Sequence, residues 1–285
     1  MSAAAAAFAV PMAKPSGLVS ISTSDTPKAG TQSESVFVVD ADEARLRRMK
    51  RRICKAAETH EAAMRQNTGY APAMVTLTYE RAGEWHPRHL SNALKHVRQW
   101  LKRRGHGMRY VWCAELQERG AIHYHVIVWF PCKTWGQGVR TVDDTPPFWD
   151  AQGWWPHGST QSAWADNPIG YIASYVSKIN GKDRLPCGAR MHGSGGYDLS
   201  ERAAMAFHSR PTWVRNLSQV GQRITRPKGG GIARHFACGL SQRIASPYVL
   251  LLRGGRRAVV ARRDAPPEQL RQFLGDLWLP KSIPA

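Results

Sequence analysis

The amino-acid sequence predicts an α+β fold, in which helices flank an antiparallel sheet. Two strand-like segments, 109–117 and 122–130, stand on either side of a short turn at 118–121, a pattern typical of an antiparallel hairpin. A further strand is expected at 73–79, AMVTLTY, which is rich in β-branched residues and ends in tyrosine. The remaining strongly patterned segments have the apolar spacing of helices.

Three segments are expected to be helical. The first, ADEARLRRMKRRICKAAETHEAAMR from about residue 40, has an apolar stripe surrounded by Arg and Lys. The second begins at Pro87, repeats apolar residues from Leu90 to Leu101 and ends at Gly105. The third is IGYIASYVSKI, from about 168 to 180. The basic side chains of the first helix form either a solvated face or a contact to a DNA backbone.

The chain divides by composition into three parts. Residues 1–36 are rich in Ala, Ser, Thr, Pro and Gly and are expected to be disordered. The patterned segments fall within 37–216, which is expected to form the main domain and includes a Trp-rich loop at 131–167. Residues 217–285 form a basic region, which is either a DNA-binding region or a flexible tail.

Charge points to a polyanionic partner. The chain has 285 residues, with 40 Lys and Arg against 21 Asp and Glu. A formal charge of +19 suits nucleic acid. We expect no membrane partner, because no apolar run approaches the ~20 residues of a membrane span. Scattered cysteines without a CxxC pair, and no convincing signal peptide, favour a soluble protein of the cytoplasm.

Two histidines stand out in the second strand of the hairpin. His123 and His125 are separated by one residue, so they share a face of the strand. Ordinary packing of two histidines is the simpler interpretation. Glu115, on the preceding strand, favours a metal site, because a three-residue loop at 119–121 would place it opposite His125 on the same face. A two-residue loop would turn it to the other face, and Glu118 in the turn is the substitute ligand.

Two histidines and a carboxylate with open coordination positions suit Mg²⁺ or Mn²⁺ that holds a phosphate oxygen. A second group of reactive side chains lies on the last helix. Tyr171 and Tyr175 are four residues apart and therefore share a face, which Lys178 continues. They are either amphipathic residues at the edge of a core or phenolic nucleophiles, which can form a phosphotyrosine bond.

These motifs, in this order, resemble those of rolling-circle replication initiators (Rep proteins) of the HUH endonuclease superfamily, of the filamentous-phage and small-plasmid type. The resemblance covers about residues 73–200. It is carried by VTLTY at 75–79, by His123-Tyr124-His125, and by Tyr171 and Tyr175 with Lys178; WWPHG at 154–158 and GARMHGSGGY at 188–197 add to it. It implies a sheet of about five strands with the histidine strand at its centre and a helix that presents the paired tyrosines.

The resemblance also implies an activity. Such proteins nick one origin strand through a 5′-phosphotyrosine, leave a 3′-OH primer and later rejoin the displaced strand. It implies that His123, His125 and Glu115 bind the metal, that Tyr171 and Tyr175 are the nucleophiles, in an order left open, and that Lys178 assists them. Arg119, Trp154 and Trp155 are candidate DNA contacts, and the tryptophans either stack on bases or pack in the core.

The expected substrate is single-stranded or hairpin origin DNA in a bacterial host cell. Because the chain has no GxxxxGK[ST] motif, a host helicase would unwind the duplex and a host DNA polymerase would extend the primer. Two other interpretations remain open. One is a relaxase or transposase of the same superfamily, although the YxxxYxxK pair favours replication. The other is a noncatalytic DNA-binding regulator.

Overall fold

The computed structural model describes residues 35–65, 69–132, 145–179, 185–228, 230–268 and 270. In chain order its elements are β1 (Val36–Asp40), α1 (Ala41–Arg65), β2 (Tyr70–Thr78), α2 (His89–Arg103), β3 (Arg109–Leu116), β4 (Ile122–Pro131), β5 (Thr160–Trp164), α3 (Pro168–Lys178), β6 (His192–Gly195), α4 (Leu199–His208), α5 (Thr212–Asn216), β7 (Ile224–Thr225), β8 (Ile232–His235), β9 (Ser241–Ile244), β10 (Tyr248–Gly254) and β11 (Arg257–Arg262).

A five-stranded antiparallel sheet forms the centre of the structure, as predicted. Its strand order is β5-β2-β4-β3-β6, so the strand that carries both histidines is the middle one. The three expected helices are present as α1, α2 and α3. The expected loop at 131–167 is wrong in one part, because Thr160–Trp164 pairs with β2 as edge strand β5. Its pattern is too short and too polar to read as a strand.

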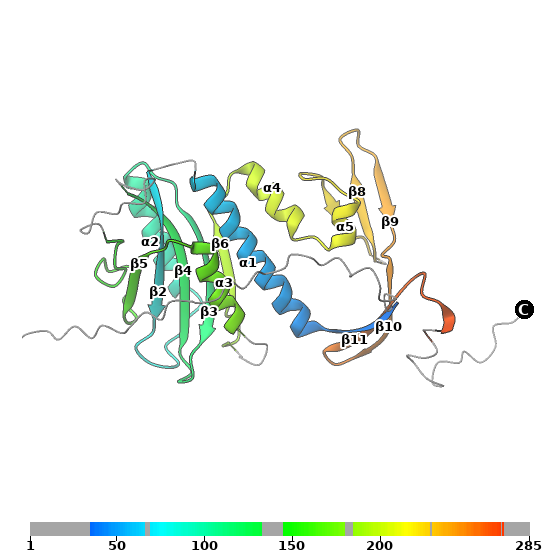
Figure 1. Cartoon of the computed structure of the whole chain (residues 1–285), viewed down its shortest axis with the longest axis horizontal. Coiled ribbons are helices and arrows are strands. Elements are labelled where there is room, and N and C mark those ends of the chain that lie inside the picture. Colours follow the sequence, from blue (N-terminus) through cyan, green and yellow to red (C-terminus); the bar gives the residue numbers. More distant parts are fainter. Residues whose placement is uncertain are drawn as a thin grey trace, which may run out of the picture.

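Helices cover both faces of this sheet (Figure 1). Against one face lies α2, whose buried stripe from Leu90 to Leu101 packs on alternate residues of β4 such as Tyr124 and Val126. Against the other face lie α1 and α3, which pack on Ile127 and Trp129. The sheet therefore separates two cores, and His125 faces the one that contains α3.

The long helix α1 joins this body to the rest of the chain (Figure 1). Asp40 begins it by accepting hydrogen bonds from the backbone N–H groups of Asp42 and Glu43. The strand before it, β1, belongs to a second sheet of order β1-β11-β10. A third sheet has the order β7-β8-β9. The segment from 224 to 262 is thus built of strands and is not a flexible tail.

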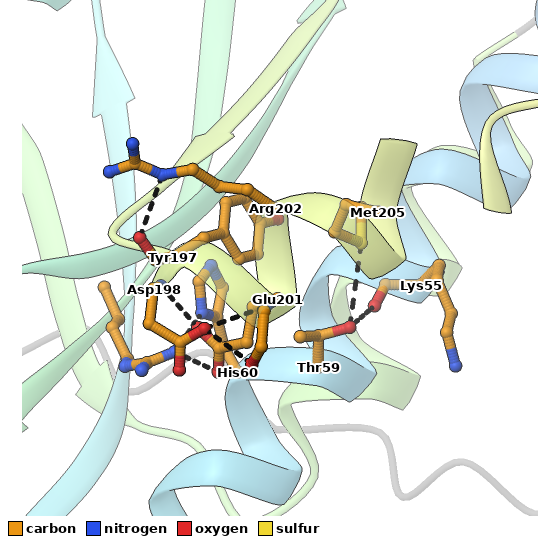
Figure 2. A network of polar contacts seen from close by, with 10 residues as sticks. Lys55, Thr59, His60, Tyr197, Asp198, Glu201, Arg202 and Met205 are labelled. Atoms are coloured by element: carbon orange, nitrogen blue, oxygen red, sulfur yellow. Dashed lines mark hydrogen bonds and ion pairs between the residues drawn. The ribbon is translucent and has the colours of Figure 1, made fainter. Parts of the chain in front are cut away.

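A buried network fixes α4 against α1 and the sheet (Figure 2). The ring of His60, on α1, stacks on the ring of Tyr197 with centroids 4.4 Å apart. Its Nδ1 atom lies 3.3 Å from the guanidinium of Arg109, which also donates two hydrogen bonds to Glu201 at 2.8 and 2.9 Å. Glu201 and Asp198 form a capping box at the start of α4. The chain after β6 is therefore held to the same face of the sheet as α3.

Within the described residues, no helix is long and apolar enough to cross a membrane. The expected disorder of residues 1–36 falls almost wholly outside the described residues, and Val36 already belongs to β1. Part of the Trp-rich loop, 133–144, also lies outside them.

Candidate active site

Strand pairing places the two histidines between a threonine strand and a carboxylate strand. In the register of β2, β4 and β3, His123 lies between Thr78 and Glu115, and His125 lies between Thr76 and Cys113. All these side chains point to one face of the sheet, because neighbours in register share a face. This is the face that α3 covers.

The position of Glu115 differs from the prediction by one register step. It lies opposite His123, not opposite His125. The reason is the turn, which spans residues 117–121: the N–H of Gln117 donates to the carbonyl of Ala121, and Gly120 has a φ of +79°. Because the turn is longer than expected by an even number of residues, Glu115 keeps the expected face. Glu118 is exposed in the turn.

Two hydrogen bonds fix the ring of His125. Its Nε2 atom lies 3.0 Å from a carboxylate oxygen of Glu115, and its Nδ1 atom lies 3.3 Å from the hydroxyl of Thr76. With Nε2–H donating to the carboxylate, Nδ1 accepts from the hydroxyl, so the imidazole is satisfied while neutral. Burial, then the neighbouring His123 and Lys178, lowers the pKa of His125 to about 3.

His123 is half-buried, and its Nε2 atom is buried without a hydrogen-bond partner among the described residues. Burial, then the guanidinium of Arg119, lowers its pKa to about 4. Both imidazoles are therefore neutral at neutral pH. A neutral imidazole nitrogen has a lone pair that a metal ion can use.

Helix α3 places the two tyrosines over this face. Its start is fixed by Asn167, whose side-chain oxygen accepts a 2.8 Å hydrogen bond from the N–H of Gly170, with Pro168 next in the chain. The buried residues Ile172 and Val176 turn one stripe of the helix toward the core. The tyrosine stripe lies about 100° around the helix from it, at the edge of the buried surface.

The tyrosine stripe meets the histidine strand directly. The ring of Tyr175 stacks on the ring of His125, with centroids 3.5 Å apart and an interplanar angle of 28°. The rings of Tyr171 and Tyr175 are 4.7 Å apart. The ammonium of Lys178 lies 4.9 Å from the centroid of the Tyr175 ring. Five of the side chains expected to carry chemistry, from β3, β4 and α3, thus lie in one chain of contacts: Glu115, His125, Tyr175, Tyr171 and Lys178.

The two tyrosines have different environments. The hydroxyl of Tyr171 is buried without a hydrogen bond of good geometry in the described part of the chain. Burial, then the neighbouring hydroxyl of Tyr175, raises the pKa of Tyr171 well above its usual range. Both side chains are half-buried overall, whereas Lys178 is exposed. Tyr171 is therefore a poor nucleophile at neutral pH in this conformation.

The donor set fits a divalent metal ion, although the side chains do not converge on one point as placed. Two neutral imidazoles and a carboxylate are ligands for Mg²⁺ or Mn²⁺, and the Nε2 atom of His123 has no competing hydrogen bond in the described structure. Among the described residues, no group of three or more His, Cys, Asp or Glu is arranged to hold an ion. In particular, His125 and Glu115 bond to each other.

The candidate DNA contacts lie in two different environments. Arg119 is exposed on the turn, and its guanidinium donates to the carbonyls of Tyr79 and Glu80 at 2.7 and 3.1 Å, so it holds the turn to the end of β2. Trp154 and Trp155 are only 8% and 1% exposed and pack in the core beside α2. Their rings cannot stack on bases in this conformation, so the structure places them as packing residues.

Sequence reasoning missed two side chains that adjoin the site. Thr76 was quoted in the strand motif without a role, yet it holds His125; the signal was its alternation with Thr78 along a strand next to the histidines. Lys50, on the basic face of α1, donates a 3.3 Å hydrogen bond to the carbonyl of Ser177 near the end of α3. The basic helix therefore borders the tyrosine helix, which its charge pattern alone could not predict.

Comparison with known proteins agrees with this geometry. Residues 72–180 match the family described as Replication-associated protein ORF2. The matched segment is less than half of the chain and runs from β2 to just beyond α3, so it includes both histidines, Glu115 and the tyrosine pair. No curated protein and no solved structure matches the chain. Over this segment the chain is similar to replication-associated proteins, which supports a role in the initiation of replication.

Proposed function

We propose that this protein initiates rolling-circle replication as an HUH-type endonuclease, which nicks one origin strand through a 5′-phosphotyrosine and later rejoins the displaced strand. The observation that carries the proposal is the stacking of Tyr175 on His125, because it brings a phenol beside the strand that offers two imidazoles and a carboxylate. The family match over residues 72–180 supports the same process.

In this proposal His123, His125 and Glu115 hold Mg²⁺ or Mn²⁺. The ion would supply positive charge to a phosphate oxygen and so stabilise the charge that develops during cleavage. Glu115 now bonds to His125, and it would have to turn from that bond to share an ion with both imidazoles. Thr76 would then accept a hydrogen bond from Nδ1–H of His125 and keep the ring in place.

The chemical step exchanges one phosphate ester for another. The phenolic oxygen of a tyrosine forms a bond to phosphorus, and the bond from phosphorus to the 3′-oxygen breaks. The phenolic proton leaves to solvent or a bound hydroxide, and the departing 3′-oxygen takes up a proton to become the 3′-OH primer. No ATP is needed, because the phosphotyrosine bond conserves the energy for rejoining. A second tyrosine lets the same helix receive the second strand.

The remaining residues position the strand. The ammonium of Lys178, beside the ring of Tyr175, is placed to neutralise the scissile phosphate or to favour the phenolate form. The proposed substrate is single-stranded or hairpin DNA, because the face must reach one strand closely. A host helicase and a host DNA polymerase in the bacterial cytoplasm would supply unwinding and extension.

A nicking assay tests the proposal. Protein is incubated with a supercoiled plasmid that carries the replicon's origin region, with Mg²⁺ or Mn²⁺ and then with EDTA. We expect open-circular DNA with protein attached to the 5′ end, and no product with EDTA or when Tyr171 and Tyr175 are both changed to Phe. If DNA is bound but no adduct forms with either ion, the protein is a noncatalytic regulator and the proposal is overturned.

A further inference from the structure

The segment that follows β6 lies outside the family match, which ends at residue 180. It contains α4, α5 and the sheet β7-β8-β9. In Figure 1, α5 and the strands β8 and β9 lie on the far side of α1 from the five-stranded sheet. The proposed nicking chemistry gives this part of the chain no task.

Its charge is wholly of one sign. Residues 202–244 include eight Arg and Lys and no Asp or Glu. Within this segment, the guanidinium groups of Arg210, Arg234 and Arg243 donate to backbone carbonyls of Gln222, Leu217 and Lys228. Such bonds orient the side chains but leave their positive charge in place. A surface of this kind attracts a polyanion.

The register of the small sheet sorts its side chains onto two faces. Pairing of Thr225 with Ala233, and of Ala233 with Arg243, puts these residues on one face. By alternation the same face carries His235 and Ser241, and Arg223 lies opposite His235, to whose N–H its carbonyl bonds. This polar face of the sheet is defined by six residues: Arg223, Thr225, Ala233, His235, Ser241 and Arg243.

The opposite face is turned inward. It carries Ile224, Ile232 and Ile244, of which Ile232 is 3% exposed. Arg234 is on this face as well, and its bond to the carbonyl of Leu217 directs it toward the end of α5. The polar face therefore looks away from α5, and Arg223 and Arg243 on it are both exposed.

Hydrogen bonds hold the polar face rigid. His235 lies at its centre, with Nε2 at 2.9 Å from the hydroxyl of Thr225 and Nδ1 at 2.8 Å from the hydroxyl of Ser241. These bonds tie side chains of β7, β8 and β9 into one row, with an arginine at each end. Guanidinium and hydroxyl groups are the side chains that contact phosphate oxygens in protein–DNA complexes.

We propose that the polar face of the β7-β8-β9 sheet binds the phosphate backbone of duplex DNA, beside the nicked strand. A duplex suits it better than a single strand, because single-strand sites stack bases on exposed aromatic rings and this face has none except the bonded His235. A rigid row of donors suits the fixed spacing of duplex phosphates. The inference rests on the proposed function only in the choice of DNA as the polyanion.

The test measures binding of the full-length protein to a short duplex of arbitrary sequence, in EDTA, over a range of salt concentrations. Without a divalent ion the result does not depend on whether the protein nicks DNA. For Arg223→Ala with Arg243→Ala we expect duplex affinity to fall roughly tenfold or more, and the slope of log affinity against log salt to fall by about one for each arginine. Cleavage of single-stranded origin DNA should not change.

The matched control removes the same charge elsewhere. Arg98 and Arg103 are exposed on α2, on the face of the sheet opposite the tyrosines, and changing both to Ala should leave duplex affinity within about twofold. Arg223→Glu alone leaves the bond from Arg243 to Lys228 intact and should also weaken duplex binding. Unchanged duplex affinity in a folded variant, an equal loss in the control, or a loss seen only with a single-stranded probe would each overturn the proposal.

Discussion

The aromatic ring of Tyr175 lies face to face with the imidazole of His125, at a centroid distance of 3.5 Å. The two residues come from α3 and from the central strand β4, which are separated by a turn, an edge strand and the Trp-rich segment. The contact brings the expected nucleophile and the expected metal ligand into one small region. Most of what the structure adds to the sequence follows from this contact.

The environment of the two tyrosines predicts which one starts the reaction. Tyr175 adjoins the ammonium of Lys178, whereas burial keeps the Tyr171 phenol protonated. We expect Tyr175→Phe to lower the rate of first-strand cleavage by at least about 100-fold, and Tyr171→Phe by less than about tenfold. Single-turnover cleavage of a single-stranded origin oligonucleotide measures both. The reverse order of effects would show that the buried phenol attacks first.

The hydroxyl of Thr76 should matter for metal affinity, because it orients His125 from the neighbouring strand. Loss of such a supporting hydrogen bond typically weakens metal binding by about 10- to 100-fold. We expect this loss for Thr76→Val in a calorimetric titration with Mn²⁺. Thr59→Val is the matched control, since the Thr59 hydroxyl bonds to a carbonyl of its own helix. Equal affinities in the two variants would exclude the role.

Lys178 is predicted to act in the chemical step more than in binding. We expect Lys178→Gln to lower kcat for cleavage by about 10- to 100-fold with little change in KM, because a charge that faces the scissile phosphate helps most when charge develops. Lys178→Arg should restore part of the rate. Lys95→Gln, at an exposed position on α2, serves as control. A change confined to KM would instead make Lys178 a general DNA contact.

Acid should destabilise the fold through His60. Burial, then the guanidinium of Arg109, lowers the pKa of His60 to about 3 from an ordinary value of 6.5. Below pH 6.5 the unfolded chain binds a proton that the folded chain does not, so stability falls as the pH falls from 6.5 toward 3. His60 alone should cost about 3 kcal/mol between pH 7 and pH 4.

Denaturant unfolding of His60→Phe, which keeps a ring against Tyr197, measures this cost. The free energy of unfolding of the variant should depend on pH less steeply than that of the wild type. Parallel curves for the two proteins would mean that His60 does not carry the effect.

Local patterns were enough to predict the framework of the site. The apolar spacing of residues 41–65 and 168–178 predicted α1 and α3, and the hairpin pattern predicted β3 and β4. The alternation of side chains along a strand put both histidines on one face, and the helical repeat put both tyrosines on one stripe. These features depend only on periodicities within one element.

What depends on distant pairing was not predictable in the same way. The length of the turn at 117–121 shifted Glu115 from His125 to His123. The strand β5 is short and is stabilised by its pairing with β2, and the burial of Trp154 and Trp155 depends on α2 and the sheet. The basic region after residue 217 was visible as charge, but its amphipathic sheet is defined by a register between three short strands.

The most direct test of the account is to identify the amino acid that carries the DNA. Wild-type protein is allowed to react with single-stranded origin DNA and Mn²⁺, the adduct is digested, and the nucleotide-bearing peptide is sequenced by mass spectrometry. The account predicts a 5′-phosphate ester on Tyr175, and on Tyr171 after strand transfer. An adduct on any other residue, or cleavage that leaves no protein on the 5′ end, would contradict it.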